Sequence, residues 1–73
     1  MLFPNKLFSY EESVISKFPV ILTAIKDTPM KIRPLFKENE KSFSGVSEFY
    51  EVLDCLYALQ KICLNSKGEL ILC

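Results

Sequence analysis

The chain has 73 residues, of which 49% are hydrophobic, and nine Lys and Arg balance nine Asp and Glu to give no net charge. A domain this small leaves little room for an active-site cavity, because it hides only about 60% of the surface that its unfolded form exposes. Nucleic-acid-binding domains usually carry a clear basic excess, so the balance of charges argues against that class.

The hydrophobic residues are mostly bulky, and only two of them are Ala. A core of this size does not easily enclose them all, so we expect part of this bulk to form an apolar patch on the surface. Such a patch indicates a protein partner. The alternative is a tightly packed domain with scattered exposed side chains.

The first predicted helical segment follows an extended N-terminal arm, residues 1–10. Ser9 and Glu12 have the spacing of a capping box, which predicts a short helical turn from about Glu11 to Ser16. Pro19 suits a first helical turn better than a helix interior, so a separate helix is expected from about Lys17 to Lys26. Its buried face comprises Ile21, Leu22 and Ile25.

Two shorter elements follow the turn at "DTP". "MKI" alternates apolar and charged residues and predicts a very short strand. A second helix is expected from about Pro34 to Lys41, with Leu35 and Phe36 making its buried contacts. "SFSG" then separates it from the next helix, with Ser44 or Ser47 as the cap.

The third helix is expected from about Ser47 to Lys61. At 3.6 residues per turn, one arc faces the core and the opposite arc faces solvent. Tyr50 and Tyr57 flank the polar side, where they either stack along its edge or pack with a hydrated hydroxyl group. The predicted core arc is Phe49, Val52, Leu53, Leu56 and Leu59, and the polar arc is Ser47, Glu51, Asp54, Ala58 and Lys61.

The chain ends in a predicted β-hairpin, residues 62–73. "NSKG" gives a four-residue connection in which Asn65 and Gly68 tolerate positive φ. The strands are apolar at successive positions, whereas a hairpin with one solvent face would alternate. The edge strand of the hairpin can pair with the edge of a partner's sheet through its backbone hydrogen bonds. Without such a partner, its unpaired backbone groups would favour aggregation.

The order of helix, strand, helix, helix and hairpin predicts one α+β, mainly α domain over residues 1–73, with a winged-helix-like three-helix core and a hairpin wing. In DNA-binding winged helices the third helix enters the major groove. Here it presents Glu48, Glu51 and Asp54 against one Lys61, which would repel phosphates. A small winged-helix transcriptional regulator fits the fold but not these charges, and it is kept as the alternative function.

Catalysis and cofactor binding are not expected. The chain has no His, only two Gly, and three Cys without a CxxC pair, so it lacks the usual base, phosphate loop and zinc ligands. Cys55, Cys63 and Cys73 are expected as reduced thiols. No small-molecule substrate follows from these residues.

No membrane segment is expected either. The start, "MLFPNKLFSYEES", lacks a basic leader and an unbroken apolar stretch. The most apolar window, Val14 to Ile25, contains Ser16, Lys17 and Pro19 and is shorter than the roughly 20 residues of a membrane span. We therefore expect a cytoplasmic protein.

The stretch "SEFYEVLDCLYALQKICLNSKGELIL" resembles the small middle components of bacterial ABC-three-component systems, the class that includes Lamassu-type anti-phage defence. Leu53 and Asp54 precede "LYAL", and Lys61 and Ile62 lead into the hairpin. "PNKLFSYEESVISKFPVIL" is similar to the beginning of the family, so the resemblance covers nearly the whole chain. The family often has Gly where this chain has Gln60, which leaves the end of the third helix open.

The resemblance implies a non-catalytic adaptor subunit between an SMC-like ABC ATPase and an effector, such as a nuclease. By this resemblance the subunit docks on the ATPase like a kleisin's terminal winged helix and helps hold the effector inactive until foreign DNA is sensed. By the same resemblance, the subunit would contact DNA only indirectly, through the complex. The expected protein-contact residues are Phe3, Leu7 and Phe8 of the arm, Tyr50 and Tyr57 of the third helix, and Leu70, Ile71 and Leu72 of the hairpin.

Overall fold

The first described elements meet at Pro19. The computed structural model describes residues 12–73; residues 12–16 are helical and a turn follows at Lys17. Helix α2 covers Phe18–Ile25 and has Pro19 in its first turn, where the missing N–H breaks no helical hydrogen bond. The predicted break and helix are confirmed. Ile21 and Ile25 are buried, and the predicted arm and the Ser9 cap lie outside the described residues.

Helix α3, Ile32–Asn39, starts two residues earlier than predicted. Lys31 before it is extended, and Pro34 lies in the first turn, where backbone N–H groups have no helical partner. The predicted "MKI" strand is therefore reduced to Met30, which forms an isolated bridge with Leu70. The expected C-terminal turn of the helix is instead the 3-10 helix η1, Glu40–Ser42.

Helix α4, Val46–Ala58, carries the predicted apolar arc. Phe49, Val52, Leu53 and Leu56 are all buried, as expected. Leu59 is 57% exposed, so its place in the predicted core is wrong. Leu59 is the C-cap of α4, which ends three residues before Lys61, and at this last position of the helix its side chain stays largely in solvent.

The end of α4 is set by Gln60, which has φ 61°. The N–H of Gln60 donates to the carbonyl of Tyr57, and the N–H of Lys61 donates to that of Leu56. These two bonds are those of a Schellman motif, in which the left-handed residue is usually Gly. Gln60 therefore adopts the conformation that Gly usually takes after a helix end, and the helix stops there.

The hairpin pairs β1, Ile62–Leu64, with β2, Leu70–Leu72, in antiparallel register. Its turn is closed by the N–H of Gly68 donating to the carbonyl of Asn65, and Gly68 has φ 78°. Asn65 does not adopt positive φ. Its Oδ1 instead accepts the N–H groups of Lys67 and Glu69, both at 2.9 Å. The predicted connection is confirmed, but Asn65 acts through its side chain.

Strand β2 lies between β1 and Met30. The N–H of Leu70 donates to the carbonyl of Met30 at 2.7 Å, and the reverse bond is 3.3 Å long. The segment before α3 and the end of the chain are thereby joined side by side. The predicted α+β, mainly α class, with a helical core and a C-terminal antiparallel hairpin, is confirmed.

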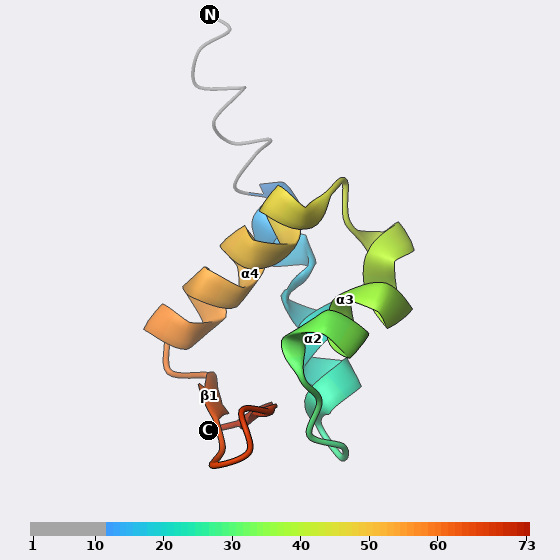
Figure 1. Cartoon of the computed structure of the whole chain (residues 1–73). Helices are drawn as coiled ribbons and strands as arrows, with labels where there is room; N and C mark the ends of the chain where they lie inside the picture. The colour runs from blue at the N-terminus through green and yellow to red at the C-terminus, as the bar shows by residue number, and fades with distance from the viewer. Residues whose placement is uncertain (1–11) are drawn as a thin grey trace, which may run out of the picture.

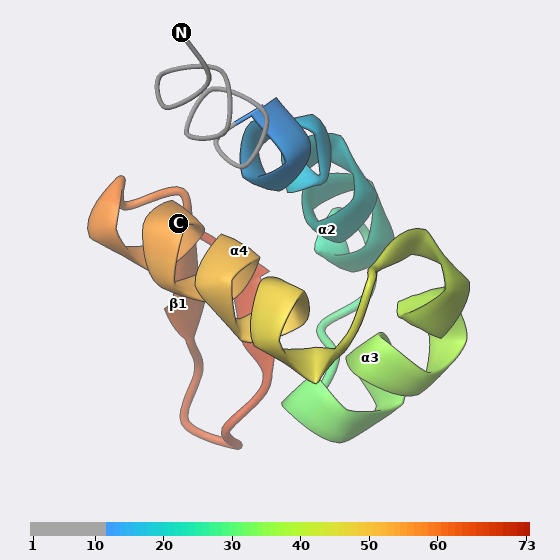
Figure 2. The ribbon, with the colours of Figure 1, turned by 90° about the horizontal axis from the view of Figure 1, so that it is seen from above.

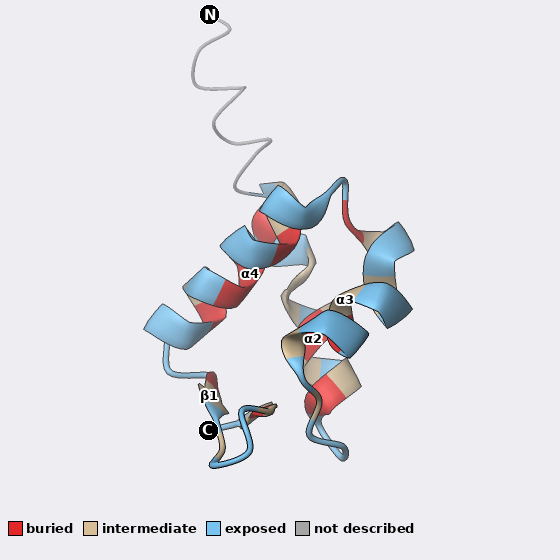
Figure 3. Ribbon diagram, viewed as in Figure 1, coloured by how far each residue is buried: buried red, intermediate tan, exposed pale blue. Residues whose placement is uncertain are grey.

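Helices α2 and α3 lie on the same side of α4, and the hairpin lies at the C-terminal end of α4 (Figures 1 and 2). The buried positions of α4 face α2 and α3 (Figure 3). Phe49, Ile21, Leu35 and Leu56 are completely enclosed there, and Ile62 and Leu70 close the core from the hairpin. The core therefore sits between the helices and one face of the hairpin.

The start of α4 is tied to residues 12–16 by Glu48. One carboxylate oxygen accepts the Ser13 hydroxyl at 2.6 Å, and the other accepts the Ser44 N–H at 2.9 Å. Gly45 is the N-cap and provides no side-chain bond, so neither Ser44 nor Ser47 caps α4 as predicted; Glu48, in the first turn of α4, instead reaches back to the N–H of Ser44. The Ser13 hydroxyl, followed by the Ser44 N–H, holds the pKa of Glu48 below its ordinary value of 4.5.

Replacing Gln60 by Gly is expected to stabilise the protein by about 1 kcal/mol, because a left-handed conformation costs a residue with a side chain about that much. Urea unfolding measures the change. Gln60→Ala is the matched control and should bring no such gain, since Ala keeps the steric cost. Equal stability of the Gly and Ala variants would contradict this account of the helix end.

Glu48→Gln is expected to lower stability at pH 7 by about 0.5 kcal/mol, the typical size of the effect of a negative charge in the first turn of a helix. Because the folded pKa is lowered, the ionised carboxylate stabilises the fold above pH 4.5, and this advantage is lost as the pH falls through the folded pKa. The difference in melting temperature between the original protein and the variant should therefore shrink as the pH is lowered from 7 to 3. Glu51→Gln, on the exposed face of α4, serves as control, and a pH-independent gap would refute the assignment.

Candidate protein-interaction surfaces

Large apolar side chains reach the surface near both ends of α4. Val46 and Tyr50 are 50% and 48% exposed in its first half, whereas Tyr57 is 61% exposed near its end. The hairpin adds Leu64 and Leu72. Together with Ile15 and Leu59, these are the exposed large hydrophobics among residues 12–73. Large apolar side chains are therefore exposed at several places in the described part of the chain.

A groove of about 680 Å³ lies between α3 and the first half of α4. Phe36 and Phe49 line it, with ring centroids 4.9 Å apart, and Val46 and Tyr50 line it from α4. Phe49 also contacts the ring of Tyr50 at 5.6 Å. The groove is thus mainly aromatic and aliphatic, and it resembles an ordinary ligand cleft in size.

Charged side chains of α3 line the same groove. Arg33 and Lys37 are exposed, lie one helical turn apart, and are accompanied by Glu38. On the solvent face of α4, by contrast, Glu51 and Asp54 are exposed. The groove is therefore bordered by an excess of positive charge on the α3 side.

A second hollow, of about 550 Å³, lies at the other end of α4 and is lined by Tyr57, Gln60, Ile62, Cys63 and Cys73. Tyr50 and Tyr57 therefore lie in two different hollows and do not form one stacked edge. The seven residues between them correspond to roughly 10 Å along a helix. The two tyrosines can accordingly contact different partners.

The hairpin residues predicted as contacts differ in exposure. Leu70 is 4% exposed and belongs to the core, where its backbone is bonded to Met30. Ile71 is half-buried and Leu72 is 40% exposed. Phe3, Leu7 and Phe8 lie outside the described residues. Of the hairpin residues named from the sequence, Leu72 is thus the most accessible.

Leu64, which is not among the contact residues expected from the sequence, is 53% exposed on the outer strand β1. The N–H groups of Cys73 and Asn65 donate across the hairpin to Lys61 and Glu69, and antiparallel pairing alternates, so the peptide groups of Leu64 point away from β2. Because Met30 pairs with Leu70 of β2, β1 is left as the outermost strand. No signal in the local sequence gives that order.

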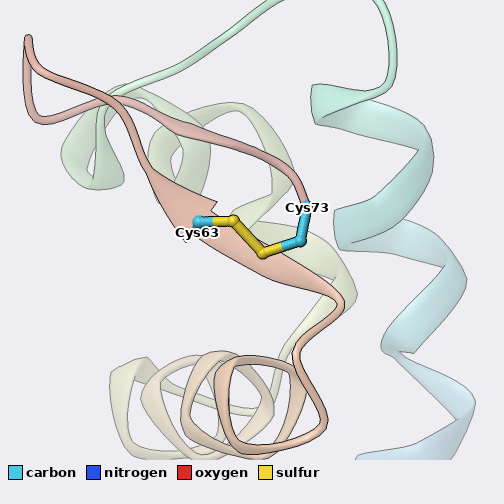
Figure 4. The surroundings of a disulfide bond; sticks show 2 residues. All are labelled: Cys63 and Cys73. Carbon is cyan, nitrogen blue, oxygen red and sulfur yellow. A yellow bond between two sulfur atoms is a disulfide. The ribbon is translucent and has the colours of Figure 1, made fainter.

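Cys63 and Cys73 form a disulfide bond (Figure 4), so the expectation of reduced thiols is wrong for this pair. The two residues are ten positions apart in sequence, but Cys63 lies opposite Ile71, two residues before Cys73. The hairpin thereby brings their Cα atoms to 5.4 Å, within the range that a disulfide spans. Cys55 is free and half-buried.

No cluster of three His, Cys, Asp or Glu side chains suited to a metal ion occurs among residues 12–73. In the same range, no helix combines the length and apolar composition that crossing a membrane requires. The surfaces with a defined chemistry are the two hollows and the outer part of the hairpin.

One family model matches this chain, over residues 3–71, and it is described as ABC-three component (ABC-3C) system Middle Component 7. The match covers almost the whole chain, including the arm, α4 and the hairpin. No curated protein and no solved structure matches the chain significantly.

Cys73→Ser is expected to lower the free energy of unfolding by about 2 to 3 kcal/mol under oxidising conditions, because the bond closes a short loop in the unfolded chain. Urea unfolding with and without reductant measures this effect. Reductant should bring the original protein to the stability of the variant and leave the variant unchanged. If reductant left the free energy of unfolding of the original protein unchanged, the disulfide bond would not contribute to its stability.

Proposed function

We propose that this chain, which belongs to the Middle Component 7 family of ABC-three component systems, is a non-catalytic adaptor that links an SMC-like ABC ATPase to an effector nuclease. As a member of that family it is a component of a multi-subunit system. The adaptor role, the ATPase and the effector are the further steps of the proposal.

The observation that carries the proposal is the separation of two apolar hollows along α4. A linking subunit must contact two proteins at once, and Tyr50 and Tyr57 lie in different hollows, formed with α3 and with the hairpin. Both side chains are about half exposed or more. Tyrosine is enriched at the centres of protein interfaces, where its ring is buried and its hydroxyl finds a partner.

The hairpin supports the same role. Leu64 and Leu72 are exposed, and the backbone of Leu64 points away from β2, so a partner can contact both side chains and peptide groups. The N-terminal residues Phe3, Leu7 and Phe8 are proposed as a third contact region. Catalysis is assigned to the partners, since the middle-component family is not a known catalytic family.

Met30, between α2 and α3, pairs with β2, and β2 pairs with β1; this arrangement supports the winged-helix interpretation, in which the hairpin is the wing. We further propose that the complex acts in the cytoplasm in Lamassu-type defence against phages or plasmids. In this role the subunit holds the effector inactive until the complex senses foreign DNA. The acidic Glu51 and Asp54 on the exposed face of α4 disfavour direct reading of DNA.

Co-purification with the ATPase and effector of the same system tests the proposal. Tyr50→Ala and Tyr57→Ala are each expected to weaken binding by about tenfold, as the loss of a central interface residue does. The two variants should affect different partners, because their hollows are separate. Glu51→Ala, between them on α4, is the control.

The proposal would be refuted by a chain that recruits neither protein, or by a complex that survives alanine at Tyr50, Tyr57 and the three N-terminal residues together. Salt-sensitive binding of the isolated chain to duplex DNA would instead favour a transcriptional regulator. In that case neutralising Lys31, Arg33 and Lys37, all exposed near α3, should abolish binding.

A further inference from the structure

We propose that the groove between α3 and α4 binds a partner segment in which large apolar side chains, including an aromatic one, are flanked by Asp or Glu. This inference rests on the proposed adaptor function and names the chemistry of one partner. The groove is the hollow lined by Phe36, Phe49, Val46 and Tyr50, with Arg33 and Lys37 on its α3 side.

The apolar part of the ligand follows from the lining of the groove. Phe49 is completely buried and forms the contact between Phe36 and Tyr50, with ring centroids 4.9 and 5.6 Å away. Val46 and Tyr50 remain half exposed beside it. Aromatic rings pack favourably edge to face as well as offset, so an aromatic side chain can contact this lining in several orientations.

The rings also make the groove largely preformed. Phe49 is held from a second side by Phe43, 5.3 Å away and nearly perpendicular to it. Phe43 is itself buried, just before the start of α4. A ligand therefore meets side chains whose positions are already set by the core, which reduces the ordering cost of binding.

The acidic part of the ligand follows from the charges. Arg33 and Lys37 line the groove against a single carboxylate, Glu38. Acidic groups on the ligand would be attracted to Arg33 and Lys37 on the α3 side of the groove. The charges thus favour acidic residues and also orient them toward α3.

The size of the groove favours a peptide segment over a single side chain. Its volume of about 680 Å³ is in the range of clefts that hold ligands of several functional groups. A DNA phosphate backbone would match the two cations, but it offers no apolar group to the aromatic lining. A protein segment satisfies both features of the groove.

The test uses the full chain and three labelled peptides of about ten residues. The first contains Phe and Leu flanked by Asp and Glu, the second has Lys at the acidic positions, and the third has Ala at the apolar positions. Fluorescence anisotropy should show the first peptide binding about tenfold more tightly than either other peptide. Amide NMR shifts should be concentrated at the groove.

Paired variants of the chain complete the test. Tyr50→Ala should weaken binding of the acidic peptide by about fivefold, and Arg33→Glu with Lys37→Glu should reverse the preference toward the Lys peptide. Tyr57→Ala and Lys67→Glu are matched controls, because they change the same residue types at exposed positions away from the groove, and should leave binding unchanged. Circular dichroism verifies that each variant is folded.

Absence of binding at about 1 mM peptide would overturn the inference, as would equal binding of the three peptides or no effect of the double charge reversal. Displacement of the peptide by duplex DNA would also overturn it. A complex that assembles normally with the groove variants would refute the inference and leave the adaptor function standing. If the chain binds the peptide but recruits neither the ATPase nor the effector, the adaptor function is refuted and the inference about the groove stands.

Discussion

The packing around Phe49 is the interaction on which the rest of the described structure depends. This ring is completely buried on α4 and contacts the rings of Phe36, Phe43 and Tyr50. It therefore joins α3, the segment before α4 and α4 itself at one point. Because a small domain has few fully enclosed side chains, one such ring contributes a large share of its core.

The same ring connects stability to surface chemistry. Its inner side belongs to the core, while its neighbours Phe36 and Tyr50 line the groove between α3 and α4. The groove is consequently a continuation of the core to the surface. A partner that fills it would extend the packing of the domain, which is a property of interfaces that form within lasting complexes.

The end of α4 separates this groove from the second hollow. Gln60 in the left-handed conformation stops the helix and turns the chain into β1, so Tyr57 and Ile62 form a hollow with the disulfide-bonded hairpin. Leu59, the C-cap of α4, remains largely exposed between the helix and the hairpin. The left-handed conformation of Gln60 thus sets the point at which the hairpin begins.

The sequence by itself determined the helices and the turn, because Pro19, Pro34, the apolar arc of α4 and the Asn65–Gly68 turn act over short distances along the chain. It also indicated a surplus of apolar side chains. Tertiary structure alone decided the central place of β2, the Cys63–Cys73 pair and the separation of Tyr50 from Tyr57. These features depend on the register of strand pairing and on which elements pack against each end of α4, and no local periodicity contains either.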